Sequence, residues 1–229
     1  MSTILSLDTS TKVCSVAIHQ EGVLIGHQAY HLQKSHSNLL PGIIQQLAEN
    51  CEVSLSDLTA IALSAGPGSY TGLRIGTATA KGLAYTLSIP FIALDTLDAM
   101  IAQVAPMLKG EGLLCPMIDA RRMEVYCKVV SHSGDEIWKT QPLIVDEHSF
   151  DDLPQEHIYF FGNGSNKLEE IFGGNEKCHF IGDIHPSAAH MGEMAWARFQ
   201  DSAFEDIAYF EPEYLKEYRT NVPSQKFKV

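Results

Sequence analysis

Three features that would point to a membrane, secreted or nucleic-acid-binding protein are missing from this 229-residue chain. No apolar stretch approaches the ~20 residues that a membrane-spanning helix needs. The first residues, Met1 to Asp8, carry no basic region ahead of their apolar residues, and Asp8 interrupts the apolar run. A secretory signal is therefore not expected, and neither is contact with a membrane. We expect a cytoplasmic protein.

Paired cysteines and an excess of basic residues are also missing. The five cysteines are odd in number, scattered and never spaced as CxxC, which favours free thiols in a reducing compartment. The formal net charge of -12 repels phosphate backbones, so nucleic-acid binding through a basic face of this chain is disfavoured. Such an acidic surface fits general solubility or docking to a basic partner.

The hydrophobic pattern of the first half predicts strands and helices in alternation, typical of an α/β fold. A strand over 4–7 ends on Asp8, and a hairpin with a glycine turn follows. A later strand runs through a glycine corner into a helix. The predicted elements are strands at 4–7, 13–19, 23–30, 59–64 and 90–94, and helices at 37–50, 72–88 and 96–107.

The second half repeats this order of elements. An apolar strand over 113–118 ends on Asp119, a hairpin follows over 123–130 and 136–145, and a strand at 158–161 enters a second glycine corner. We therefore expect two α/β lobes, residues 1–108 and residues 109–229, joined near the linker at 109–112. Duplicated lobes of this kind resemble the actin, hexokinase and Hsp70-like (ASKHA) architecture, in which a nucleotide usually lies between the lobes.

The segment from Gly66 to Gly76 reads GPGSYTGLRIG and lies between a buried strand and a helix. Glycines flanking Pro67 force a narrow turn, and Ser69 and Thr71 can cap the helix that follows. The segment predicts either an anion-binding loop or a fixed corner for helix docking.

A nucleotide site is one interpretation of the acidic turns. An Asp that closes the first strand can orient a metal–phosphate group, and hydroxyls and turn amides donate to phosphate oxygens. No GxxxxGK[ST] loop is present, however, and the same residues suit ordinary turns. We predict at most a weak or vestigial nucleotide site, with no bound cofactor. Its candidate residues are Asp8, Thr9, Ser10, Gly66, Gly68 and Asp119.

Metal and hydrolase chemistry have little support in the sequence. His31 and His36 straddle a strand end and a helix start. His185 and His190, if helical, point about 140° apart. No third ligand clusters with either pair, so no metal site is expected. A GxSxG elbow is absent, although a peptidase with residues brought together only in space stays an alternative.

The sequence next to the glycine corner resembles one family. GPGSYTGLRIG, the opening Ile4–Thr11, the segment Ser35–Pro41 and the tail Glu211–Leu215 resemble the bacterial TsaB (YeaZ) family of tRNA threonylcarbamoyladenosine biosynthesis proteins. The resemblance implies a non-catalytic scaffold. Its partners would be a catalytic TsaD-like transferase, a TsaE-like ATPase in a larger complex, and a second copy of itself, with tRNA reached only through the complex. A transferase or peptidase acting alone is the alternative.

The same resemblance implies that two helices form the partner surface. Gly72 and Gly76 have GxxxG spacing, and small residues let a neighbouring helix approach closely, whether it belongs to the same lobe or to another chain. From pattern alone these stripes are core. The residues assigned to partner binding are Leu39, Leu40, Ile43, Ile44, Leu47, Gly72, Arg74, Gly76, Thr77, Lys81 and Tyr85.

Overall fold

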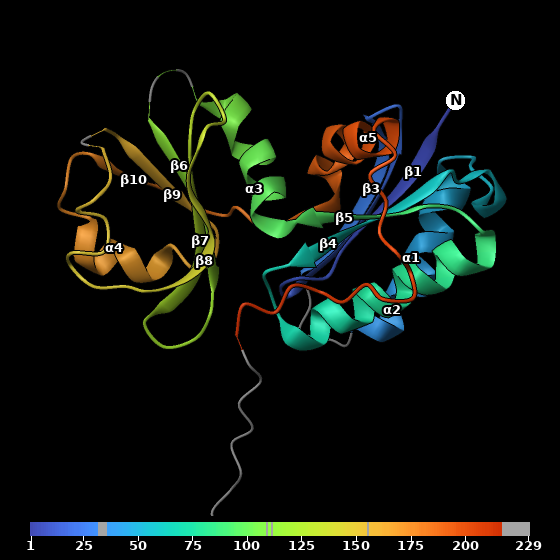
Figure 1. The fold of residues 1–229 in the computed structure, drawn as a ribbon, viewed down its shortest axis with the longest axis horizontal. Coiled ribbons are helices and arrows are strands. Elements are labelled where there is room, and N and C mark those ends of the chain that lie inside the picture. The colour runs from blue at the N-terminus through green and yellow to red at the C-terminus, as the bar shows by residue number, and fades with distance from the viewer. Residues whose placement is uncertain (32–35, 109, 111, 155, 217–229) are drawn as a thin grey trace, which may run out of the picture.

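The computed structural model describes residues 1–31, 36–108, 110, 112–154 and 156–216, which form two lobes, each built on a five-stranded mixed sheet (Figure 1). Ser35, Lys109, Glu111 and Glu217, used in the sequence interpretation, lie outside these residues. In the described part of the chain, no helix is long and apolar enough to cross a membrane.

The first sheet has the strand order β3-β2-β1-β4-β5. Strands β1, β2 and β3 form an antiparallel meander, whereas β4 and β5 run parallel to β1. The parallel strands are nearly continuous runs of buried residues, as expected for strands covered on both faces. The bounds are β1 Thr3–Asp8, β2 Val13–Gln20, β3 Val23–His31, β4 Ala60–Gly66 and β5 Phe91–Asp95.

The second sheet has the order β10-β9-β6-β7-β8, which is the same topology read from the opposite edge. Here too an antiparallel hairpin pairs with a central strand, and two further strands run parallel to it. The predicted duplication of two α/β lobes is thus confirmed. The bounds are β6 Leu113–Asp119, β7 Glu124–Ser131, β8 Glu136–Ile144, β9 Ile158–Phe161 and β10 Cys178–Ile181.

Five α-helices appear among the described residues, and they are distributed unequally between the lobes. Helices α1 and α2 cover one face of the first sheet, and α5 covers the other (Figure 1). Helix α3 leads from the first sheet to the second, and the short α4 packs in the second lobe. The bounds are α1 His36–Asn50, α2 Tyr70–Leu87, α3 Thr96–Val104, α4 Asn166–Phe172 and α5 Gly192–Gln200.

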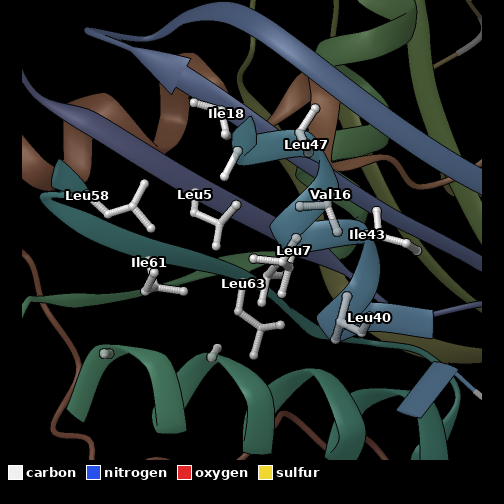
Figure 2. Close-up of a cluster of buried hydrophobic side chains, with 14 of the residues drawn as sticks. Leu5, Leu7, Val16, Ile18, Leu40, Ile43, Leu47, Leu58, Ile61 and Leu63 are labelled. Atoms are coloured by element: carbon white, nitrogen blue, oxygen red, sulfur yellow. The ribbon is translucent and has the colours of Figure 1, made fainter. Parts of the chain in front are cut away.

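The core of the first lobe lies between the sheet and helices α1 and α2 (Figure 2). Because strand side chains alternate between faces, Leu5 and Leu7 of β1 point toward these helices, whereas Ile4 points toward α5. Each fully buried leucine side chain contributes about 1.5–3 kcal/mol relative to an exposed one. The stripe of apolar residues on α1 therefore holds the helix against its own sheet.

The C-terminal part of the chain departs from the sequence expectation, which missed β10 and α5. Residues Ala188, Met191 and Ala195 pack into the first lobe, against Ile4 and neighbouring small residues. The predicted third helix ends at Val104, where a short 3-10 turn takes over. The first sheet ends at Asp95 and the second begins at Leu113, and the lobe boundary expected near residue 108 stays a prediction. We propose that the first lobe also includes the segment from residue 188 to residue 216.

Candidate functional site

The turn after β1, predicted as part of a nucleotide site, is sealed inside the first lobe. Asp8, Thr9 and Ser10 are each fully buried. The Oδ1 atom of Asp8 accepts hydrogen bonds from the backbone N–H of Ser10 at 3.1 Å and from its hydroxyl at 3.0 Å. Burial raises the pKa of Asp8, and the neighbouring hydroxyls of Ser64 and Ser10 oppose that rise. This carboxyl group therefore stabilises a turn and is closed to solvent.

The glycine corner is what seals this turn. The N–H of Ser69 donates to the carbonyl of Ser10 at 2.6 Å, and the Thr9 hydroxyl donates to the carbonyl of Gly72 at 2.8 Å. A Cβ atom at Gly68 would collide with Ser10, and one at Gly72 or Gly76 would collide with Thr9. Of the two interpretations of this segment, the fixed corner matches the contacts seen.

Gly66, the other glycine assigned to the nucleotide site, meets the C-terminal part of the chain. It has a φ of +130°, and a Cβ atom there would lie 2.7 Å from the carbonyl oxygen of Glu213. Ser69 caps α2, as predicted, by accepting a hydrogen bond from the N–H of Gly72 at 3.4 Å. The glycines of the corner thus allow close packing against the turn after β1 on one side and against the C-terminal part of the chain on the other.

Asp119, the last nucleotide candidate, occupies the equivalent turn of the second lobe and is exposed there. Its Oδ1 atom pairs with the ammonium of Lys167 at 2.5 Å and accepts from the N–H of Arg121 at 2.6 Å. Its own N–H donates to Asn163 at 2.9 Å. The cation that pairs with Asp119 thus comes from α4.

The residues assigned to partner binding divide into an inward and an outward group. Leu40, Ile43, Ile44 and Leu47 of α1 are buried in the core of the lobe, Gly72 and Gly76 of α2 are buried against Thr9, and Thr77 is buried beside the C-terminal part of the chain. The outward group comprises Arg74 and Tyr85, which are exposed, and Leu39 and Lys81, which are half-buried, Leu39 against the core. Tyr85 is 79% exposed. The inward group therefore acts as support, and partner contact stays a prediction that rests on the outward group.

A C-terminal strap, residues 205–216, crosses the outer side of α2 and was not expected from periodicity. Its Glu213 N–H donates to the carbonyl of Ala65 at 2.9 Å, and the carbonyl of Phe210 accepts from Lys81 at 3.1 Å. The ring of Tyr214 packs 4.9 Å from that of Tyr70, centroid to centroid. Only the tail motif Glu211–Leu215 hinted at this element.

The strap and α2 enclose a groove of about 570 Å³ that Arg74, Thr77 and Lys81 line from the helix. The guanidinium of Arg74 lies 4.5 Å above the ring of Tyr70. At its far end the strap reaches the second lobe, where Lys216 pairs with Glu124. The strap thus joins the corner, helix α2 and the second lobe.

Polar contacts also connect the lobes at the start of α3. Asp95 caps the helix by accepting from the N–H of Leu97 at 2.6 Å, and the hydroxyl of Thr140 on β8 donates to it at 2.5 Å. Burial raises the pKa of Asp95 to about 6. Nearby, the ammonium of Lys128 lies 2.7 Å from Asp98 and 3.3 Å from Glu136.

The described residues contain no arrangement that favours metal binding or a reactive thiol. No group of three or more His, Cys, Asp or Glu side chains there could hold a metal ion. All five cysteines are free, as predicted. Burial raises the pKa of Cys14 to about 11 and that of Cys127 to about 12, which disfavours the thiolate form that a nucleophile needs.

The duplicated sheets, the interlobe helix and the acidic turns after β1 and β6 define an α/β protein of the actin-like, two-lobed ASKHA class. Among solved structures, YeaZ from Pseudomonas aeruginosa superimposes with a TM-score of 0.79 at 26% identity, covering 94% of this chain and 100% of that one. Another P. aeruginosa structure, described as similar to peptidase YEAZ, gives 0.79 at 27% identity over the same shares. The ethanolamine utilization protein EutJ from Carboxydothermus hydrogenoformans, at 10% identity and a TM-score of 0.50, shares the fold.

Sequence comparison narrows this class to one family. Residues 30–224 match the family model for TsaD, tRNA N6-adenosine threonylcarbamoyltransferase. The tRNA threonylcarbamoyladenosine biosynthesis protein TsaB of Escherichia coli is 32% identical over 97% of both chains. TsaB of Bacillus subtilis is 28% identical, over 93% of this chain and 94% of that one. The chain belongs to the TsaB (YeaZ) family.

Proposed function

We propose that this chain is a cytoplasmic, non-catalytic subunit that holds a TsaD-like transferase active during threonylcarbamoyladenosine formation on tRNA. The sealed turn after β1 is the observation that carries the proposal. Asp8, Thr9 and Ser10 are fully buried, and the glycines of α2 pack directly on them. A phosphate group has no room at this turn unless α2 moves. The first lobe therefore keeps the ASKHA architecture, but its turn after β1 is not open to a nucleotide phosphate.

The outward faces of α1 and α2 are the proposed docking face. Gly42 on α1 and Gly82 on α2 are exposed, and a Cβ atom at either position would meet nothing within 4 Å. Small residues on adjacent helices allow a partner helix to approach closely. Tyr85 and Arg74 flank this surface, and both residue types are enriched at interfaces. A TsaD-like subunit and a second copy of this chain would compete for the same face.

Independent catalysis is a weaker candidate. One P. aeruginosa relative is similar to a protein called a peptidase, YEAZ. In this chain, the serine on the glycine corner accepts a backbone hydrogen bond as the cap of α2. The buried cysteines have raised pKa values. Neither arrangement favours a nucleophile, so the scaffold role is the function we propose. A TsaE-like ATPase would join the resulting complex.

Substitution of an open glycine tests the docking face without touching the core. Gly82→Leu adds a bulky side chain to the exposed side of α2, at a position where a Cβ atom has no other atom within 4 Å. We expect the affinity for the TsaD-like transferase of the same organism, measured by isothermal titration calorimetry, to fall at least tenfold, about 1.4 kcal/mol. Gly174→Leu is the matched control, because Gly174 is equally open but lies in the second lobe. Equal affinities of the two variants would refute the docking face.

A further inference from the structure

The chain returns from the second lobe to the first through a segment that rests on few polar contacts. In this segment, residues 182–191, a short 3-10 helix spans Ala188–His190. The N–H of Ala188 donates to the hydroxyl of Ser15 at 2.9 Å, and the carbonyl of Ala189 lies 3.2 Å from Nε2 of His19. Helix α5 follows directly and packs on the first sheet through buried apolar residues such as Ala195, so these polar contacts lie at the entrance to that apolar junction.

Five of the ten histidines of the chain gather where this segment meets the sheet. His19 on β2 and His27 and His31 on β3 share one face, because His27 pairs with Ala17 and His31 with Val13 in the strand register. His185 and His190 come from the returning segment. The sequence interpretation considered these two on a helix, pointing apart. Their segment is not α-helical, and the ring of His185 contacts that of His31 across the junction.

One ring contact joins a histidine of the sheet to a histidine of the returning segment. The rings of His31 and His185 lie edge to face with centroids 5.2 Å apart. His19 is fully buried, with its Nδ1 atom 3.2 Å from the hydroxyl of Ser6. Burial lowers the pKa of His190 and of His19, and the charge of a nearby histidine, His27 for His190 and His190 for His19, lowers it further. Neutral imidazoles pack well in this arrangement, whereas charged ones would repel across the junction.

We propose that this histidine cluster forms an acid-sensitive latch, which holds the returning segment and α5 on the first sheet while His19, His185 and His190 are neutral and releases them when these three are protonated. The latch goes beyond the proposed scaffold function and does not depend on it. Because the strap follows α5 and lies along α2, its release would also loosen the groove at Arg74 and Lys81.

The pH at which the latch opens follows from the surroundings of each ring. Burial lowers the pKa of His19, His185 and His190, and the neighbouring histidines lower it further. An undocked histidine titrates near 6.5. The docked state is therefore fully favoured above that pH and loses stability as the pH falls below it. Each histidine that must stay neutral favours undocking by up to about tenfold at pH 5.5.

Acidic groups around the latch are few. Asp183 precedes the segment and raises the pKa of His185, although burial and His31 outweigh it. Glu21 lies on the β2–β3 turn, and Glu193 lies in the first turn of α5. On α3, which also packs near the segment, Asp98 is paired with Lys128. These carboxylates determine how far below pH 6.5 the midpoint of latch opening lies.

The two tryptophans of the chain allow the latch to be observed directly, because they lie in different lobes. Trp196 on α5 packs beside Gly22 of the β2–β3 turn. Trp138 on β8 stacks on Phe150 in the second lobe. Trp138→Phe leaves Trp196 as the sole reporter of α5 docking, and Trp196→Phe leaves Trp138 as the reporter of the other lobe. The emission maximum is the quantity to follow, since protonated histidine alters intensity.

We expect the Trp196 maximum to shift to longer wavelength between pH 7.5 and 5.5, with a midpoint below 6.5, while the Trp138 maximum stays constant. His27→Asn combined with His31→Asn, both exposed positions on β3, should move the Trp196 midpoint to lower pH. His132→Asn, an exposed histidine of the second lobe, should not. A constant Trp196 maximum, parallel shifts of both reporters, or an unchanged midpoint in the β3 variant would each overturn the latch.

Discussion

The two lobes share one strand order but differ in what their glycine corners hold. In the first lobe, the corner presses α2 onto the turn after β1 and buries Asp8 completely. In the second lobe, Gly162 and Gly164 pack on the backbone of Met117 and Ile118 at the end of β6, yet Asp119 stays exposed and paired with Lys167. The same architecture thus gives a sealed turn in one lobe and an open one in the other.

The two lobes also differ in the length of their helices. The first lobe has the 15-residue α1 and the 18-residue α2 side by side on one face, whereas the second lobe has only the 7-residue α4 after its corner. Long helices offer an outer face once their inner face is buried. The long helices of the first lobe are consistent with the docking face that we propose, and the second lobe anchors the strap through Glu124.

The largest effect should come from breaking the seal at α2. Gly72→Ala places a methyl group against the carbonyl oxygen of Thr9, and we expect the free energy of unfolding to fall by about 3 kcal/mol. Gly82→Ala, in the same helix but with open space around it, should raise stability by about 0.5–1 kcal/mol through helix propensity. Urea unfolding measures the free energy of unfolding of both variants. Equal stabilities would mean that the corner is not sealed.

A smaller effect should distinguish the two strand-ending aspartates. Burial raises the pKa of Asp8, so the unfolded chain releases this proton at a lower pH than the folded chain does. The stability due to Asp8 is therefore greatest below about pH 4 and falls as the pH rises toward the folded pKa.

Asp8→Asn should remove this pH dependence and raise the free energy of unfolding at pH 7, because the amide is never charged. Asp119→Asn removes only an exposed ion pair and should cost no more than about 0.5 kcal/mol. Urea unfolding between pH 4 and 7 measures both. A similar pH profile for the two variants would contradict the contrast between sealed and open turns.

The smallest effect concerns the contact between the lobes. Thr140→Val removes the hydroxyl that donates to Asp95 and favours its ionised form. The pKa of Asp95, about 6 in the native protein, should therefore rise further. Carboxyl carbon NMR follows this titration directly. Thr86→Val, an exposed position on α2, is the control and should leave the titration unchanged; a pKa of Asp95 that is unmoved by Thr140→Val would show that the lobes do not meet there.

Sequence patterns predicted the parts of this fold that depend on local order. Strands of both sheets, the hairpins and the long helices follow from apolar periodicity, and the glycine corner follows from its composition. Helix α5, strand β10 and the strap escaped detection because distant contacts stabilise them, such as Glu205 N–H with the carbonyl of Phe91. The sequence alone could not tell which apolar residues of α1 belong to the core and which to a partner surface, because both require the same residue types.

The central claim, that this chain activates a catalytic partner and does not itself transfer the threonylcarbamoyl group, is tested most directly by reconstitution. Threonylcarbamoyladenosine on tRNA is measured with the purified TsaD-like transferase, the TsaE-like ATPase and the other components required, with and without this chain, and with this chain replacing the transferase. We predict product only when the chain and the transferase are both present. Product formed by the chain without the transferase, or undiminished product without the chain, would contradict the account.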